Sequence, residues 1–221
     1  EAVEVLNLPE EEMDSLMECA YALRTKYKGK KVSVQLLTNV RSGNCTQNCA
    51  YCAQSKDSQA EIEKYKRVSD EKLYGDNDLV DEKHLARHCI GLSGIGFSDE
   101  EIEDLADRIR EMKKKDTQIC CSIGFLTEKQ ARILKDAGLD RINHNLNSSR
   151  SFYPEICTTH TYDQRVNNIK MLQSLGFEIC SGGIVGMGES KEDIVDMLMD
   201  LREINPESVP INFLLPIPGT R

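Results

Sequence analysis

The sequence predicts an α/β fold, an incomplete (β/α) barrel of the TIM type with about six strands. Three observations lead to this prediction. β-Rich segments alternate with amphipathic helical segments along most of the 221 residues, and no stretch contains strands alone. The order helix, glycine, strand recurs in DAGLDRINHNL and SLGFEICSGGI. Strands that alternate with helices of this length form parallel sheets, and a series of such units forms a barrel.

The chain begins with a predicted amphipathic helix over residues 9–28, in which Pro9 and three glutamates precede apolar residues at helical spacing. Residues 32–37 are β-rich and end before a loop with three cysteines. That loop is therefore expected at the carboxyl end of the first strand, where α/β folds place their active sites.

The following segments alternate regularly after a polar stretch, 56–83, in which we expect a helix. Three helices begin with a Ser or Thr N-cap followed three residues later by Glu or Gln, the capping-box pattern. These pairs are Ser98 with Glu101, Thr127 with Gln130 and Thr161 with Gln164. The strands are expected at 84–92, 117–123, 139–146, 177–184 and 209–215, and the helices at 98–115, 127–137, 161–175 and 190–204.

A full barrel of this type has eight strands, and about six fit before Arg221. The closing strands are therefore expected either to be absent, which leaves one side open, or to lie beyond the chain end. No low-complexity segment or linker divides the chain, so we expect one domain over 1–221, with a leading helix in 1–31 and the barrel in 32–221.

Composition narrows the class of partner. The net charge is −9, and no run of Lys and Arg is interleaved with aromatic residues, which argues against nucleic acid. The apolar runs are too short to span a bilayer, and no charged start precedes an apolar run, so we expect a cytoplasmic protein without a membrane partner. Nine cysteines, an odd number, fit reduced thiols that hold metal better than disulfides.

The stretch NCTQNCAYCAQS carries Cys45, Cys49 and Cys52 in the spacing C-x3-C-x2-C. Three thiolates on one short loop can bind three corners of a cubic iron–sulfur cluster and leave the fourth iron open to a small molecule. This is the arrangement that a radical S-adenosylmethionine (SAM) enzyme needs. A structural zinc site is the alternative, but it needs four ligands, and no fourth Cys or His lies close to this loop.

Side chains alternate along a strand, so each one faces either the helices or the barrel interior. In 117–123, the apolar face contains Cys121, which turns Cys120 inward. The same argument turns Cys180 inward, and Cys89 is a third candidate. A free buried cysteine usually behaves as a small hydrophobe, but three that converge from different strands would form a second metal site.

Three asparagines, Asn143, Asn145 and Asn147, share one face of the strand that begins at residue 139. Buried amides are costly unless they are hydrogen-bonded. A ligand rich in hydrogen-bonding groups is one partner that would satisfy them, and neighbouring backbone is the alternative. His144 falls on the opposite face, where we expect a structural role.

Five stretches carry a family resemblance. They are LLTNVRSGNCTQNCAYCAQS, RINHNLNSS, FYPEICTTHTYDQR, EICSGGIVGMGES and PESVPINFLLPIPGT. In this order they resemble the biotin synthase family of radical SAM enzymes, from about residue 32 to the end. The resemblance implies a TIM barrel that binds a 4Fe-4S cluster, an auxiliary iron–sulfur cluster, SAM and dethiobiotin, and that inserts sulfur into dethiobiotin to form biotin. It also implies a reducing partner such as flavodoxin or ferredoxin, and a homodimer.

The resemblance further implies residue roles. The 4Fe-4S cluster would be held by Cys45, Cys49 and Cys52. SAM would be bound by Tyr51, Asn145, Asn147, Arg165 and Ile184, with Arg165 at its carboxylate. Dethiobiotin would be bound by Asn143, Asn145 and Asn212. The auxiliary cluster, which the family is regarded as using as its sulfur donor, would be held by Cys89, Cys120 and Cys180.

Two departures from the family pattern affect these roles. Asn147 stands where the family has an aspartate, and its amide can still accept a hydrogen bond from a ribose hydroxyl. Cys121 is a candidate fourth ligand of the auxiliary cluster, because the family's arginine ligand falls beyond Arg221. Strict alternation makes Cys121 a core thiol, whereas a β-bulge would turn it inward. If Cys121 is a ligand, the auxiliary cluster would be of a four-iron type in place of the 2Fe-2S type.

The sequence is also compatible with two other functions. A radical SAM enzyme of the hydrogenase-maturation or pyrrolysine-pathway type would share the loop and the barrel without sulfur insertion, but Cys89, Cys120 and Cys180 together with NHNLN argue against it. A non-enzymatic metal-binding protein would not cleave SAM.

Overall fold

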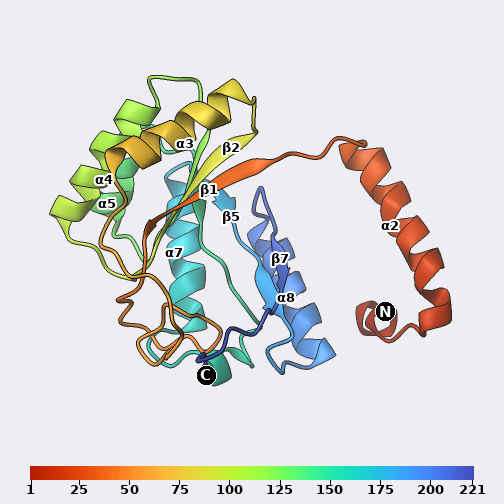
Figure 1. Ribbon diagram of the computed structural model, residues 1–221. Coiled ribbons are helices and arrows are strands. Elements are labelled where there is room, and N and C mark those ends of the chain that lie inside the picture. Colours follow the sequence, from red (N-terminus) through yellow and green to blue (C-terminus); the bar gives the residue numbers. More distant parts are fainter. The chain divides into compact units, whose positions relative to one another are not determined.

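The computed structural model describes residues 1–221 and divides into two units, Glu1–Val34 and Gln35–Arg221. The first unit contains the short helix α1 (Ala2–Leu6), a 3-10 turn at Glu10–Glu12 and α2 (Met13–Lys28) (Figure 1). The helix expected over 9–28 is therefore present from Met13 to Lys28, after the 3-10 turn. None of the helices in the chain combines the length and the apolar composition that a membrane crossing requires.

The second unit is built on parallel strands whose order in space follows their order in the chain. The first sheet contains β1 (Gln35–Arg41), β2 (Arg87–Leu92), β3 (Ile119–Ser122), β4 (Arg141–Asn143) and β5 (Glu178–Cys180), and the second contains β6 (Gly183–Val185) and β7 (Ile211–Phe213). Because β1 and β7 are not paired with each other, the barrel has an open side. This arrangement confirms the predicted incomplete (β/α) barrel.

Helices follow the strands and cover the outside of the sheet (Figure 1). They are α3 (Asp70–Glu82), α4 (Asp99–Met112), α5 (Glu128–Asp136), a short α6 (Tyr153–Ile156), α7 (Tyr162–Ser174) and α8 (Lys191–Ile204). All three predicted capping boxes are formed, at the starts of α4, α5 and α7. The helix expected over 56–83 begins only at Asp70, where Ser69 caps it.

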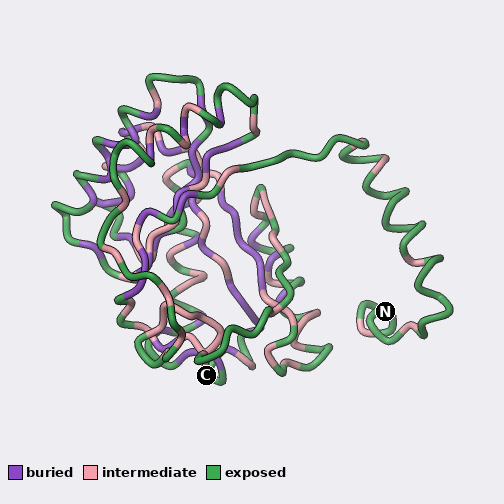
Figure 2. Tube along the Cα trace, in the orientation of Figure 1, coloured by how far each residue is buried: buried purple, intermediate pink, exposed green.

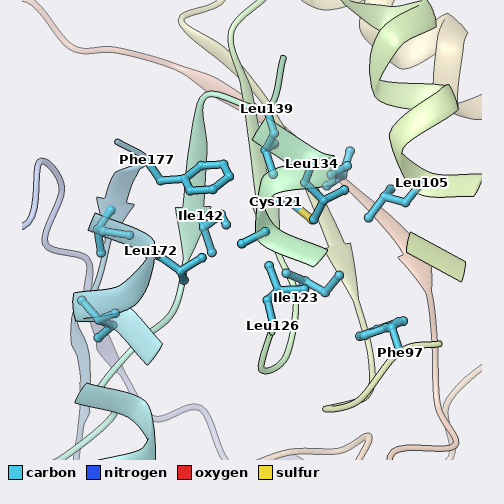
Figure 3. Close-up of a cluster of buried hydrophobic side chains, with 14 of the residues drawn as sticks. Phe97, Leu105, Cys121, Ile123, Leu126, Leu134, Leu139, Ile142, Leu172 and Phe177 are labelled. Carbon is cyan, nitrogen blue, oxygen red and sulfur yellow. The ribbon is translucent and has the colours of Figure 1, made fainter. Parts of the chain in front are cut away.

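The hydrophobic core lies between the sheet and these helices (Figure 2). One row of residues in register across the sheet is fully buried and consists of Ile90, Cys121, Ile142 and Ile179. Leucines from α4, α5 and α7 pack into the same core, and Figure 3 shows Cys121 among these side chains. The apolar face of β3 therefore meets the helices, as the alternation predicts.

The strands near the carboxyl edge are shorter than expected. β4 ends at Asn143, and the predicted strand 177–184 is divided into β5 and β6 around Gly182. A Cβ added at Gly182 would lie 1.8 Å from the carbonyl oxygen of Pro210. This glycine therefore lets the segment before β7 approach the turn between β5 and β6.

A buried histidine makes the stability of this fold depend on pH. His88 lies 2.8 Å from the hydroxyl of Thr38 and 3.2 Å from the amide oxygen of Asn77. Burial lowers the pKa of His88 to about 4, from an ordinary value of 6.5. As pH falls from about 6.5 toward 4, the unfolded chain therefore takes up a proton that the folded chain does not, and the free energy of unfolding decreases.

We expect this histidine to remove about 2 kcal/mol of stability between about pH 7 and pH 5. Urea denaturation of the metal-free chain at the two pH values measures the effect. His88→Gln keeps a hydrogen-bonding group that does not titrate, so its loss over the same range should be about 2 kcal/mol smaller. Equal losses in both proteins would contradict this assignment.

Candidate active site

The cysteine loop leaves β1 through a turn in left-handed conformation, with φ of +74° at Gly43 and +53° at Asn44. All three loop cysteines are free and half-buried. The backbone N–H of Cys52 donates to the carbonyl of Cys49 at 3.2 Å, which folds the Cys-x2-Cys part into a tight turn. The loop therefore presents its three thiols from irregular backbone at the carboxyl end of the sheet.

Asn48 attaches the loop to the segment that follows α6. Its side-chain oxygen accepts hydrogen bonds from the backbone N–H groups of Thr158 and Thr159 at 3.0 and 3.2 Å, and its NH₂ donates to the hydroxyl of Thr158 at 2.7 Å. A buried amide satisfied in this way holds both segments in one geometry.

The three loop cysteines open into a cavity of about 280 Å³. Its lining includes Cys45, Cys49, Cys52, Tyr51, Asn143, Asn145, Asn147, Arg165, Ile184 and Asn212. The cavity therefore gathers the loop cysteines and every residue expected to bind SAM or dethiobiotin. A larger cavity of about 610 Å³ shares Gln47, Ile95, Phe125 and His160 with it but contains no cysteine, so the smaller one is the candidate site.

Arg165 contributes a positive charge to this cavity. Its guanidinium donates to the carbonyl oxygen of Asn145 at 3.1 Å and to the hydroxyl of Tyr153, and it lies 5.9 Å from the ring centroid of Phe125. No carboxylate lies within 4.0 Å of the Arg165 guanidinium, and Arg165 takes part in none of the ion pairs of the chain. Since a guanidinium favours bidentate contact with carboxylates, Arg165 is suited to hold an anionic ligand group.

The asparagines differ in how far the chain satisfies them. Asn145 accepts a hydrogen bond from the N–H of Gly182 at 3.1 Å, and Asn143 donates to the sulfur of Cys180 at 3.5 Å. The side chains of Asn147 and Asn212 make no hydrogen bond within the chain, although Asn147 is only 5% exposed. Neighbouring groups therefore account for two of these amides and leave the others available to a ligand.

His144 does not point into solvent or bind a charged partner. It is buried against the edge of Phe125, with ring centroids 5.1 Å apart. Burial, and then the charge of Arg165, lower the pKa of His144 to about 3. The imidazole is therefore neutral, and it lines the same cavity.

The second set of cysteines lies on three strands of the same sheet, β2, β3 and β5. Cys89 and Cys120 are register partners on β2 and β3, and Cys180 on β5 is two positions further toward the carboxyl end, in register with Asn143 and Ser122. A hydrogen bond from Cys120, and then the charges of Arg87 and Arg141, lower the pKa of Cys89 to about 7. The same contact, together with burial, raises the pKa of Cys120.

Cys121 lies on the opposite face from Cys120. It is fully buried in the core between the sheet and the helices, and burial raises its pKa. The register between β2, β3 and β4 is continuous at this position, so no bulge turns it toward the interior.

Two residues near the loop were not predicted. Cys157 lies 3.8 Å from Cys49, measured between the sulfurs, and His160 lies 3.7 Å from the sulfur of Cys49. A Cys and a His therefore do lie beside the loop in space, which corrects the expectation based on sequence neighbours. The hydrogen bond with Cys49 lowers the pKa of Cys157 to about 3 and raises that of Cys49. The C-x2-H spacing of CTTH was the available signal.

The family model "Radical SAM superfamily" matches residues 39–201. Biotin synthase from Geobacillus kaustophilus (strain HTA426) is 41% identical over 221 residues, covering 100% of this chain and 66% of the relative. Biotin synthase from Geobacillus thermodenitrificans (strain NG80-2) is 40% identical, covering 100% and 67%. The chain thus spans about two thirds of the length of these curated relatives.

Solved structures show the same fold. The crystal structure of methylornithine synthase (PylB) superposes with a TM-score of 0.87 and 18% identity, covering 96% of this chain and 63% of that one. The FeFe-hydrogenase maturase HydG from Carboxydothermus hydrogenoformans superposes with a TM-score of 0.83 and 20% identity, covering 99% and 53%. The matched family model and the relatives at about 40% identity show that the chain belongs to the radical SAM superfamily and, within it, to the biotin synthase family.

Proposed function

We propose that this chain is the barrel of a radical SAM enzyme that inserts sulfur into dethiobiotin to form biotin. One observation carries the proposal: a single cavity is lined by three free cysteines of the C-x3-C-x2-C loop, by an arginine without a carboxylate partner and by four asparagines. The curated relatives named biotin synthase supply the substrate class.

The loop cysteines fit a cluster better than a single metal ion. Ligands of one ion must lie close together, and no set of three or more donors within 4.8 Å of one another includes Cys45 or Cys52. Thiolates that bind different irons of a 4Fe-4S cluster have no such requirement. When bound, the cluster would supply the electron that breaks the S–C5′ bond of SAM and gives methionine and a 5′-deoxyadenosyl radical. The three half-buried thiols of the loop would hold it at the cavity.

The cavity wall would bind SAM and the substrate. Arg165 offers its guanidinium to the SAM carboxylate, while Tyr51, Asn145, Asn147 and the backbone at Ile184 surround the rest of the molecule. The free amides of Asn147 and Asn212 can donate to and accept from hydroxyl or ureido groups. Asn143 links this wall to Cys180 through its 3.5 Å hydrogen bond.

Cys89, Cys120 and Cys180 would hold an auxiliary iron–sulfur cluster that donates the sulfur atom. The nearby charges of Arg87 and Arg141, which favour the thiolate of Cys89, would also stabilise a negatively charged cluster. The position of Cys121 in the core supports three cysteine ligands without it. On family grounds we further propose flavodoxin or ferredoxin as the reducing partner, and a homodimer.

The test is a product analysis with a variant that separates the two metal sites. The anaerobically reconstituted chain is incubated with SAM, dithionite and dethiobiotin, and 5′-deoxyadenosine and biotin are measured by mass spectrometry. Both products are expected, whereas Cys180→Ala should release the nucleoside without biotin, because it removes a ligand of the auxiliary site and leaves the loop cysteines and the SAM-binding residues unchanged. Nucleoside without biotin from the unmodified chain would favour another radical SAM reaction, and absence of both would overturn the proposal.

A further inference from the structure

A cluster of three donor atoms next to the loop is not used by the proposed reaction. It consists of the sulfurs of Cys49 and Cys157 and the Nε2 atom of His160, all within 4.8 Å of one another. Cys157 and His160 are buried, with 2% and 6% of their surface exposed. They come from the segment after α6, more than a hundred residues beyond Cys49.

The distances between the donors match one metal ion. The two sulfurs are 3.8 Å apart, and Nε2 lies 3.7 Å from the sulfur of Cys49 and 3.4 Å from that of Cys157. A tetrahedral zinc ion, with bonds of about 2.3 Å to sulfur and about 2.0 Å to nitrogen, places two sulfurs about 3.8 Å apart and a sulfur about 3.5 Å from a nitrogen. The three donors therefore form one face of such a tetrahedron.

Neighbouring groups hold the imidazole in the form that binds metal. The guanidinium of Arg165, which can only donate, lies 3.4 Å from Nε2. Nε2 is therefore the nitrogen with the lone pair, which a metal ion would bind in place of Arg165, and Nδ1–H donates to the hydroxyl of Tyr153 at 2.9 Å. Histidine ligands are usually oriented by such a contact at the second nitrogen. If Cys49 and Cys157 only formed a hydrogen bond with each other, the nearby lone pair of His160 would have no role in the cluster.

We propose that Cys49, Cys157 and His160 form a mononuclear site for a thiophilic divalent cation, such as Zn²⁺, in the cluster-free chain. Two thiolates neutralise the ion, which limits repulsion from Arg165. Cys49 and His160 also line the cavity, which leaves room for water as the fourth ligand. An ion at this site excludes the 4Fe-4S cluster because Cys49 serves only one of them; this competition, though not the metal site itself, rests on the proposed function.

The experiment uses Co²⁺ as an optical probe in a chain that carries Cys45→Ala and Cys120→Ala. These substitutions break the loop triad and the interior trio but keep the proposed site. The chain is stripped of iron and titrated anaerobically with Co²⁺ in the presence of a phosphine reductant. One equivalent should produce the visible ligand-field bands of a tetrahedral site with thiolate charge transfer, and Zn²⁺ should displace it stoichiometrically.

Three further variants in the same background make the result specific. Cys157→Ser keeps the size of the side chain and should weaken binding at least about 100-fold, and Tyr153→Phe should weaken it about 10-fold to 100-fold. Cys121→Ala, which alters a core thiol outside the site, should bind Co²⁺ normally. Circular dichroism shows whether each variant is folded. An unchanged titration in folded Cys157→Ser, or no tetrahedral spectrum in the background chain, would overturn the proposal.

Discussion

Replacing Cys52 with alanine is expected to lower the release of 5′-deoxyadenosine at least roughly 1000-fold, because the three loop thiolates bind the cluster as a unit and the loss of one abolishes the function of all three. Two remaining loop thiols cannot hold a cluster with one open iron. Cys52 is a better choice than Cys49, since Cys157 lies 3.8 Å from Cys49 and could replace its thiol. Burial raises the pKa of Cys52 in the metal-free chain, so cluster binding there must release a proton from the thiol.

The matched control is Cys19→Ala. Cys19 is exposed on α2, in the other unit of the chain, so its replacement should leave both iron content and nucleoside release unchanged. Iron and sulfide analysis after anaerobic reconstitution, with EPR spectra of the reduced protein, shows whether the loss follows the cluster. Normal nucleoside release by Cys52→Ala would contradict the assignment of the loop.

Replacing Gly182 with alanine should destabilise the fold by roughly 3 kcal/mol or more, since the new methyl group would meet backbone. The added Cβ would lie 1.8 Å from the carbonyl oxygen of Pro210. That oxygen cannot simply move, because it accepts the N–H of Gly183 at 3.1 Å. The segment that carries Asn212 would be displaced, so dethiobiotin binding should weaken as well.

Gly75→Ala provides the control for this substitution. Gly75 lies inside α3 with nothing within 4 Å of an added Cβ, so alanine should stabilise the chain by up to about 1 kcal/mol through helix propensity. Urea denaturation of both variants measures the difference. If Gly182→Ala unfolds at the same urea concentration as the unmodified chain, the close approach of the two segments is wrong.

Much of the fold could be predicted because it depends on local patterns. Each capping box is formed by residues three apart, so Ser98, Thr127 and Thr161 marked the helix starts correctly. The alternation along β3 likewise predicted that Cys121 faces the helices, since the side-chain period of a strand is a backbone property. Strand ends were less predictable, because the pairing of β4 with β3 and β5 ends at Asn143, although the sequence pattern continues to residue 146.

The sequence by itself determined the barrel class, the cysteine loop and the family, because these depend on spacing within single segments and on matched motifs. Only the tertiary structure decided which distant groups meet. Asn48 holds the loop against Thr158, and this contact brings Cys157 and His160 to the sulfur of Cys49. Packing of segments more than a hundred residues apart produces such contacts, and no local pattern records them.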